Sequence, residues 1–154
     1  MAGILQVLTY VSIAHDGTSL TWDIGPVPQT TMYFEESVHY KANSSASDDE
    51  WGHLIPDNGG LVYTGSDREP SMLSLFHQLR CLDIMRRTYA QRNPPGSLER
   101  HCLNYIRQMV LCRRDTRLEP VIAIDGPHTV QPWGAVTCTD WRRVYEAHKD
   151  NVRG

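Results

Sequence analysis

Two histidines stand in sequence surroundings that could do chemistry. His77 is followed at three and four residues by Arg80 and Cys81, so a helix would place all three on one side. His101 is followed at four residues by Tyr105, which a helix would place on the same flank. If the two helices face each other, the imidazoles can bind a metal ion or act as a general acid and base. We take His77, Arg80, His101 and Tyr105 as candidate catalytic residues, and the two histidines as candidate metal ligands.

The alternative for both histidines is a structural role, in which each would be a buried side chain with one hydrogen bond. The sequence contains no His-x-x-x-His pair and no zinc-finger spacing of cysteine and histidine. It also lacks a phosphate-binding loop, a dinucleotide glycine fingerprint and a nucleophile elbow. The plain alternative for Arg80 is an ion pair with Asp83. We expect Arg86 and Arg87 to be solvated near the end of their helix.

Two helices must position these residues. Apolar residues at helical spacing predict the first helix from Ser71, as its N-cap, to about Arg87. The same spacing predicts the second from Ser97 to about Arg114. The connection between them is short and contains Pro-Pro-Gly, so we expect the helices to lie antiparallel and share a core.

The rest of the chain alternates extended and helical segments. Its patterns predict strands over 5–13 and 61–63, an extended stretch over 30–40, and short helices over 48–54 and 140–149. No segment has the composition of a linker. We therefore expect one α+β domain over residues 1–154, with N-terminal extended strands packed on the antiparallel helix pair plus a short C-terminal helix.

Composition excludes several classes of function. The 154 residues are 40% hydrophobic and 21% charged, with a formal net charge of −3. Such a chain offers no strongly basic surface for a phosphate backbone, so we expect no nucleic-acid partner. No window approaches the roughly 18 consecutive apolar residues of a membrane span, so we expect a soluble chain without an anchor.

The cysteines bear on the cellular compartment. All four lie in the second half of the chain, at Cys81, Cys102, Cys112 and Cys138. Two disulfides would account for the even number, and four free thiols in a cytosolic protein would do so nearly as well. We expect the disulfides, and with them a secretory-pathway lumen or secretion. The Asn-Ser-Ser sequon at Asn43 is compatible with that location.

Several segments, in the same order, resemble the UstYa-like family of fungal proteins from pathways to mycotoxins and related peptides and polyketides. The likeness covers roughly residues 30–145. Residues 76–82, Phe-His-Gln-Leu-Arg-Cys-Leu, resemble the family's first His-x-x-His-Cys motif, and residues 101–108, with Cys112 and Asp115, resemble the second. Residues 138–141, Cys-Thr-Asp-Trp, resemble its closing Cys-Arg-Asp-Trp element. Trp51, Leu54-Ile55-Pro56 and the following glycine pair resemble the segment upstream of these motifs.

The resemblance implies oxidative chemistry on a natural product, such as cyclisation, hydroxylation, dehydrogenation or halogenation. It also implies copper bound by the motif histidines, a lumenal location, and a homo- or heterodimer with a related subunit. This sequence departs from the motifs, because Arg80, Leu98 and Val136 stand where the family has histidine. His77 and His101 remain, and further ligands could come from another group of residues: His39, His53, Asp83 and His128.

Three functions are consistent with these residues. The first is copper-dependent oxidation or oxidative cyclisation of a small-molecule intermediate, with Arg80 orienting an anionic or carbonyl group. The second is a metal-free cyclase, dehydratase or isomerase, with His77 and His101 as general acid and base and Arg80 or Tyr105 stabilising an oxyanion. The third is a non-catalytic partner subunit. We expect His148, like His15, to lie on the surface and to be dispensable.

Overall fold

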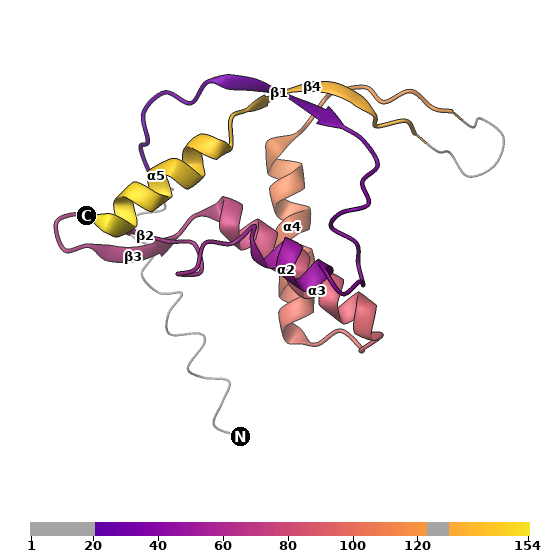
Figure 1. Ribbon diagram of the computed structural model, residues 1–154, viewed down its shortest axis with the longest axis horizontal. Helices are drawn as coiled ribbons and strands as arrows, with labels where there is room; N and C mark the ends of the chain where they lie inside the picture. The colour runs from indigo at the N-terminus through magenta and orange to yellow at the C-terminus, as the bar shows by residue number, and fades with distance from the viewer. Residues whose placement is uncertain (1–20, 123–129) are drawn as a thin grey trace.

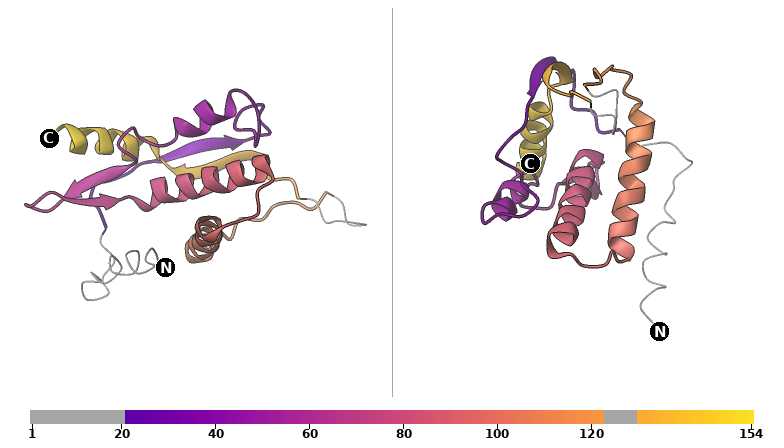
Figure 2. Two further views of the ribbon diagram at one scale, coloured as in Figure 1. Left: turned by 90° about the horizontal axis from the view of Figure 1, so that it is seen from below. Right: turned by 90° about the vertical axis from the view of Figure 1, so that its right-hand side faces the viewer.

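Two long helices dominate the computed structural model, which describes residues 21–122 and 130–154. Helix α3 (Ser74–Gln91) and helix α4 (Ser97–Arg113) pack against each other and run in broadly opposite directions, with their axes crossing obliquely (Figures 1 and 2). A short connection reverses the chain between them, and the Gly96 amide donates a hydrogen bond to Glu99 Oε2 at 2.8 Å in the first turn of α4. The predicted antiparallel helix pair is confirmed.

The chain enters α3 from a β-hairpin rather than from a serine cap. Strand β2 (Leu61–Thr64) pairs antiparallel with β3 (Glu69–Met72), so that Leu61 lies opposite Met72. Ser71, predicted as the N-cap, lies within β3, and that prediction is wrong. The β3 strand escapes sequence analysis because it contains Pro70, which is tolerated only at the edge of a sheet.

A second antiparallel ribbon joins distant parts of the chain. Strand β1 (Gln29–Phe34) pairs with β4 (Gly134–Thr139), so that Thr30 lies opposite Cys138. In Figure 1 this ribbon arches over the end of α4, away from the hairpin. The predicted strand over residues 5–13 lies outside the described residues. The α+β class that the sequence predicts is confirmed.

Two shorter helices complete the fold. They are α2 (Ser47–Gly52) and α5 (Arg142–Arg153), and α5 packs against β2. Within the described ranges, no helix is both long and apolar enough to cross a membrane.

Phe76 is the centre of the core that holds α5 against α3. Its ring makes edge-to-face contacts with Tyr145 and His148 of α5, at centroid distances of 5.0 and 5.3 Å. Gly60 permits this packing: its φ is +80°, and a Cβ there would lie 2.6 Å from the Cβ of Phe76. His148 is only 6% exposed, so the expectation of a surface position is wrong.

Arg86 anchors α2 to α3 instead of lying in solvent as predicted. Its side chain is 7% exposed and forms ion pairs with Asp83 and Asp48, at 2.7 and 2.6 Å. It also donates a hydrogen bond to the carbonyl of Ala42. A buried guanidinium needs such partners, because an unpaired buried charge is strongly destabilising. Asp83 is thus committed to Arg86 and Arg87 and forms no ion pair with Arg80.

Candidate functional site

Helices α3 and α4 bring His77, Tyr105 and His101 together as three nearly parallel rings. The His77 ring lies 4.1 Å from that of Tyr105 and 5.7 Å from that of His101, measured between centroids. The interplanar angles are 25° and 22°. His101 and Tyr105 are one helical turn apart on α4 and differ in plane by 5°. We call these three residues the ring cluster.

A pair of buried cysteines lies next to the ring cluster. Cys81 lies one turn after His77 on α3, and Cys102 is the neighbour of His101 on α4. Each is 1% exposed, and the Cys102 side chain is close enough to that of Cys81 to affect its pKa. Burial raises the pKa of the Cys81 thiol to about 12, with Cys102 adding to the effect.

Protonation differs within the ring cluster. Burial lowers the pKa of His77, and the nearby His101 and Arg80 lower it further, so His77 is neutral at pH 7. Burial raises the pKa of Tyr105, with a smaller effect from Cys81, so its hydroxyl remains protonated. The ring cluster therefore combines a neutral imidazole that can accept a proton with a phenol that can donate a hydrogen bond.

Arg80 lies one helical turn after His77 on α3. It is exposed, and its guanidinium Nη2 lies 3.1 Å from where a Cβ on Gly59 would stand. The sequence predicts that Arg80 orients an anionic or carbonyl group of the substrate; the structure places its guanidinium over the Gly59 turn, within electrostatic reach of His77. An exposed arginine there can meet an anionic group arriving from solvent.

The other candidate ligands are occupied elsewhere. His39 pairs with Glu50 at 2.7 Å, His53 donates to the carbonyl of Asp49, and Asp83 holds the two arginines. His128 lies outside the described residues. Across residues 21–122 and 130–154, no group of three or more His, Cys, Asp or Glu side chains could hold a metal ion.

The fit to copper is therefore incomplete. His77 and His101 are two imidazole donors on facing helices, whereas a redox copper site usually has three or four good ligands. Cys81 does not supply the missing one, because its thiol is buried and its pKa of about 12 keeps it protonated. The described residues do not complete a copper site.

The predicted disulfides are not found in the structure, where all four cysteines are free thiols. Cys81 and Cys102 are buried together, Cys112 is exposed and Cys138 is partly buried. Cys138 lies in β4, and its thiol donates a weak hydrogen bond to the carbonyl of Val136 in the same strand. A cross-link between Cys81 and Cys102 would join the two helices that carry the ring cluster.

Comparison with known proteins identifies the class. The profile of a family described as "Mycotoxin biosynthesis protein UstYa" matches residues 21–150, and the chain belongs to this family. It is 31% identical over 105 residues to "Oxidase ustYa" of Aspergillus flavus, covering 63% of this chain and 48% of that protein. It is 28% identical over 122 residues to "UstYa family oxidase phomYb" of Diaporthe leptostromiformis, covering 64% and 48%. The chain thus spans about half the length of these relatives, and no solved structure matches it.

Proposed function

We propose that this chain acts as a tailoring enzyme of fungal natural-product biosynthesis and that its reaction takes place at the ring cluster. The observation that carries the proposal is the convergence of His77, Tyr105 and His101 from two helices onto one stack. Both histidines belong to the segments that resemble the family's motifs. Both relatives are named oxidases, which supports an oxidation. We propose that the reaction is oxidation or oxidative cyclisation of a small-molecule intermediate.

Copper is part of this first proposal, with His77 and His101 as its ligands. When bound, copper supplies one-electron redox chemistry. Because the described residues offer these two imidazoles and no third donor, the remaining ligands must come from elsewhere. In this proposal the exposed Arg80 holds an anionic or carbonyl group of the substrate.

A second function is favoured by the opposite pKa shifts within the ring cluster. His77, held neutral by burial, would take a proton from the substrate, and Tyr105 would donate a hydrogen bond to the oxygen on which charge develops. This is the chemistry of a redox-neutral cyclase, dehydratase or isomerase. It needs neither a metal nor an oxidant.

A related partner subunit, or a second copy, is also part of the proposal. Leu103 and Val110 are seven residues apart and therefore share one face of α4, where they are 63% and 66% exposed. An apolar face of this kind supports contact with another protein. In that role the chain would contribute structure rather than catalysis.

We also propose a lumenal or secreted location. Asn43 of the sequon is exposed on the loop before α2, where a glycosyltransferase could reach it. Expression in a secreting fungal host, followed by enzymatic deglycosylation, tests this location. The proposal is supported if deglycosylation lowers the mass of the unaltered protein and leaves the mass of Asn43→Gln unchanged.

One experiment separates the functions. Purified chain is analysed for bound metal, then incubated with the pathway intermediate with copper or with chelator, each with and without oxygen. Turnover that needs copper and oxygen supports the first function. Turnover that survives chelator without oxygen supports the second. No turnover except with a related subunit supports the partner role, provided that His77→Ala leaves that turnover unchanged.

A further inference from the structure

A cavity of about 700 Å³ lies between α2, the turn that follows it and α5. Helix α3 separates it from the ring cluster, since Phe76 packs toward α5 while His77 faces α4. None of the three residues of the ring cluster lines this cavity. It is therefore a different site from the one considered above.

The walls of the cavity are tied in place. The Tyr145 hydroxyl donates a hydrogen bond to the carbonyl of Leu54 at 2.7 Å, which holds α5 to the turn after α2. Asn151 forms two hydrogen bonds with the backbone of Tyr63, at 2.8 and 2.9 Å, which hold α5 to β2. A ligand would enter a preformed space and would not have to order these elements.

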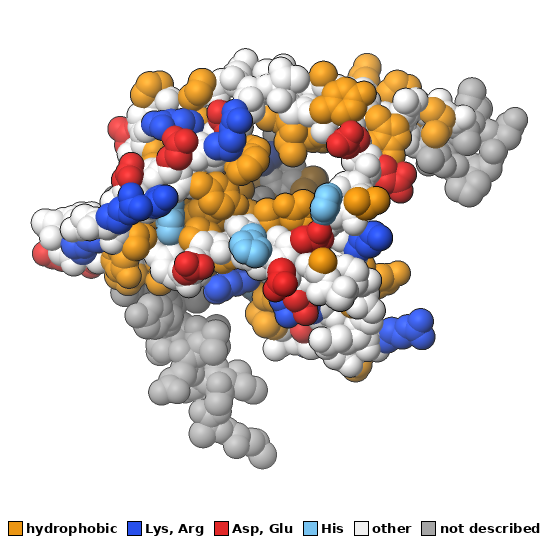
Figure 3. All heavy atoms as spheres, in the orientation of Figure 1, with side chains coloured by type: hydrophobic (Ala, Val, Ile, Leu, Met, Phe, Trp, Pro, Cys, Tyr) orange, Lys and Arg blue, Asp and Glu red, His pale blue; other side chains and the backbone are white. Residues whose placement is uncertain are grey.

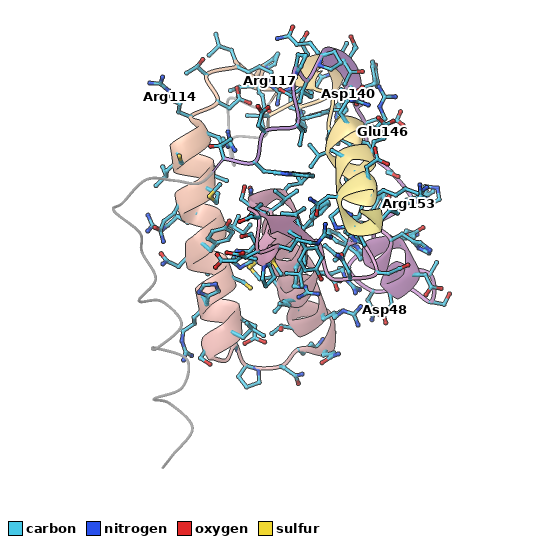
Figure 4. The ribbon with its side chains drawn as sticks, turned by 90° about the vertical axis from the view of Figure 1, so that its left-hand side faces the viewer. Asp48, Arg114, Arg117, Asp140, Glu146 and Arg153 are labelled. Atoms are coloured by element: carbon cyan, nitrogen blue, oxygen red, sulfur yellow. The ribbon has the colours of Figure 1, made fainter. Side chains whose placement is uncertain are left out.

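Opposite charges line opposite walls of the cavity. Asp49 of α2 and Asp57 of the following turn stand on one side, and Lys149 and Arg153 stand one helical turn apart on α5. Within the described part of the chain, none of these four side chains forms an ion pair, whereas Asp48 is neutralised by Arg86. Figure 3 shows charged side chains of both signs on the face between α5 and α2, and Figure 4 labels Arg153 and Asp48 at its two sides.

Two imidazoles on the cavity lining have defined tautomers. His148 Nε2 lies 3.1 Å from Asn58 Oδ1 and 3.0 Å from the carbonyl of Leu61, so the neutral ring carries its proton on Nε2. His53 Nδ1 lies 2.6 Å from the carbonyl of Asp49 and carries the proton of that ring. Each neutral ring keeps one lone pair, which can accept a hydrogen bond from an ammonium group.

We propose that this cavity binds a small zwitterion whose ammonium and carboxylate groups lie at opposite ends of an apolar body. The carboxylate pairs with Lys149 and Arg153, and the ammonium lies toward Asp49 and Asp57. The apolar body packs on Ile55 and Val152, which also line the cavity. A zwitterion satisfies both walls at once, whereas an ion of either sign would leave the other wall unpaired and be repelled by it.

The test is calorimetric titration of the full chain with 6-aminohexanoate, hexanoate and hexylamine. We expect 6-aminohexanoate to bind at least about tenfold more tightly than either singly charged analogue, which corresponds to one charge-assisted contact. In Lys149→Gln/Arg153→Gln, its affinity should fall to that of hexylamine. In Asp49→Asn/Asp57→Asn, it should fall to that of hexanoate.

The control variant is Arg113→Gln, which removes an exposed arginine at the end of α4, away from the cavity. It should bind 6-aminohexanoate like the unaltered chain, and circular dichroism should show every variant folded. Absence of binding to the unaltered chain would overturn the proposal. Equal affinity for the three probes, or equal loss in the control and the cavity variants, would overturn it as well. These measurements do not depend on activity at the ring cluster.

Discussion

The Tyr105 ring lies nearly parallel to the His77 ring, with 4.1 Å between their centroids. This contact joins α3 to α4 through two residues whose pKa values burial shifts in opposite directions, in each case against the charged form. His77 is kept uncharged by a lowered pKa, and Tyr105 by a raised one. Both groups are therefore neutral at pH 7. Neutral rings can pack closely without the desolvation cost of a buried charge.

Substitutions in the ring cluster should abolish turnover while the chain stays folded. We expect His77→Ala and His101→Ala each to reduce kcat/KM by at least about a hundredfold, the usual contribution of a positioned acid or base. His77 is partly buried and His101 is exposed, so neither substitution should open a large cavity in the core.

The matched control is His39→Ala. His39 is an exposed histidine that pairs with Glu50 on another part of the surface, so its loss should leave turnover within about twofold of normal. Near-full activity in both His77→Ala and His101→Ala would contradict the assignment of the site. His148→Ala is unsuitable as a control, because this histidine is buried against Phe76.

The lowered pKa of His77 should make stability depend on pH. Its pKa in the folded state is below the ordinary imidazole value of about 6.5, so the unfolded chain binds more protons between the two values. The free energy of unfolding should then fall as pH decreases from about 6.5 through the folded-state pKa of His77. Urea unfolding at a series of pH values measures this slope.

Two variants test whether His77 causes the dependence of the free energy of unfolding on pH. His77→Gln should remove its share of the pH dependence, because glutamine does not titrate. Arg80→Leu should reduce it, because the nearby guanidinium contributes to the lowered pKa. An unchanged slope in His77→Gln would show that another group is responsible.

Local pattern was sufficient to predict the helix pair and its candidate residues. The apolar spacing of α3 and α4 and the short proline-containing connection predict an antiparallel pair, and His77, His101 and Tyr105 then meet because of helical geometry. Helical spacing also places Arg80 on the side of α3 that carries His77. Its long side chain nevertheless reaches over Gly59, and no periodicity predicts where a flexible arginine ends.

Contacts between distant segments could not be predicted in the same way. Strands β1 and β4 pair across about a hundred residues, and no local pattern indicates such a partner. Arg86 is buried because Asp48 and the Ala42 carbonyl reach it from the α2 region. His148 was a partial exception: Tyr145, His148 and Val152 are spaced as one helical face, which indicates that this face of α5 is turned inward.

Gly60 should be indispensable because of its contact with Phe76. Replacement by alanine combines a positive φ of +80° with a Cβ placed 2.6 Å from the Phe76 side chain. The backbone conformation alone costs about 1–3 kcal/mol for a residue other than glycine. The clash adds to this, because Phe76 is fully buried among α5 side chains and has little room to move.

Gly65→Ala separates the two effects. Gly65 has a similar φ of +71°, but nothing lies within 4 Å of a Cβ at that position. We expect Gly60→Ala to lower the free energy of unfolding clearly more than Gly65→Ala does. Urea denaturation of both variants measures this difference. Equal losses would mean that Phe76 adjusts and that backbone strain accounts for the whole effect.

The cysteines should react in an order set by burial. Cys112 is exposed and should be alkylated first, and Cys138, which is partly buried, should follow. Cys81 and Cys102 should react only after unfolding, because both are 1% exposed and the Cys81 pKa of about 12 leaves almost no thiolate at pH 8. Mass spectrometry after timed iodoacetamide treatment, with and without denaturant, measures this order. The contradicting result is a denatured, non-reduced sample in which Cys81 and Cys102 still do not react with iodoacetamide. That result would show that a disulfide joins α3 to α4 in the isolated protein, so that a covalent bond rather than packing holds the two residues together.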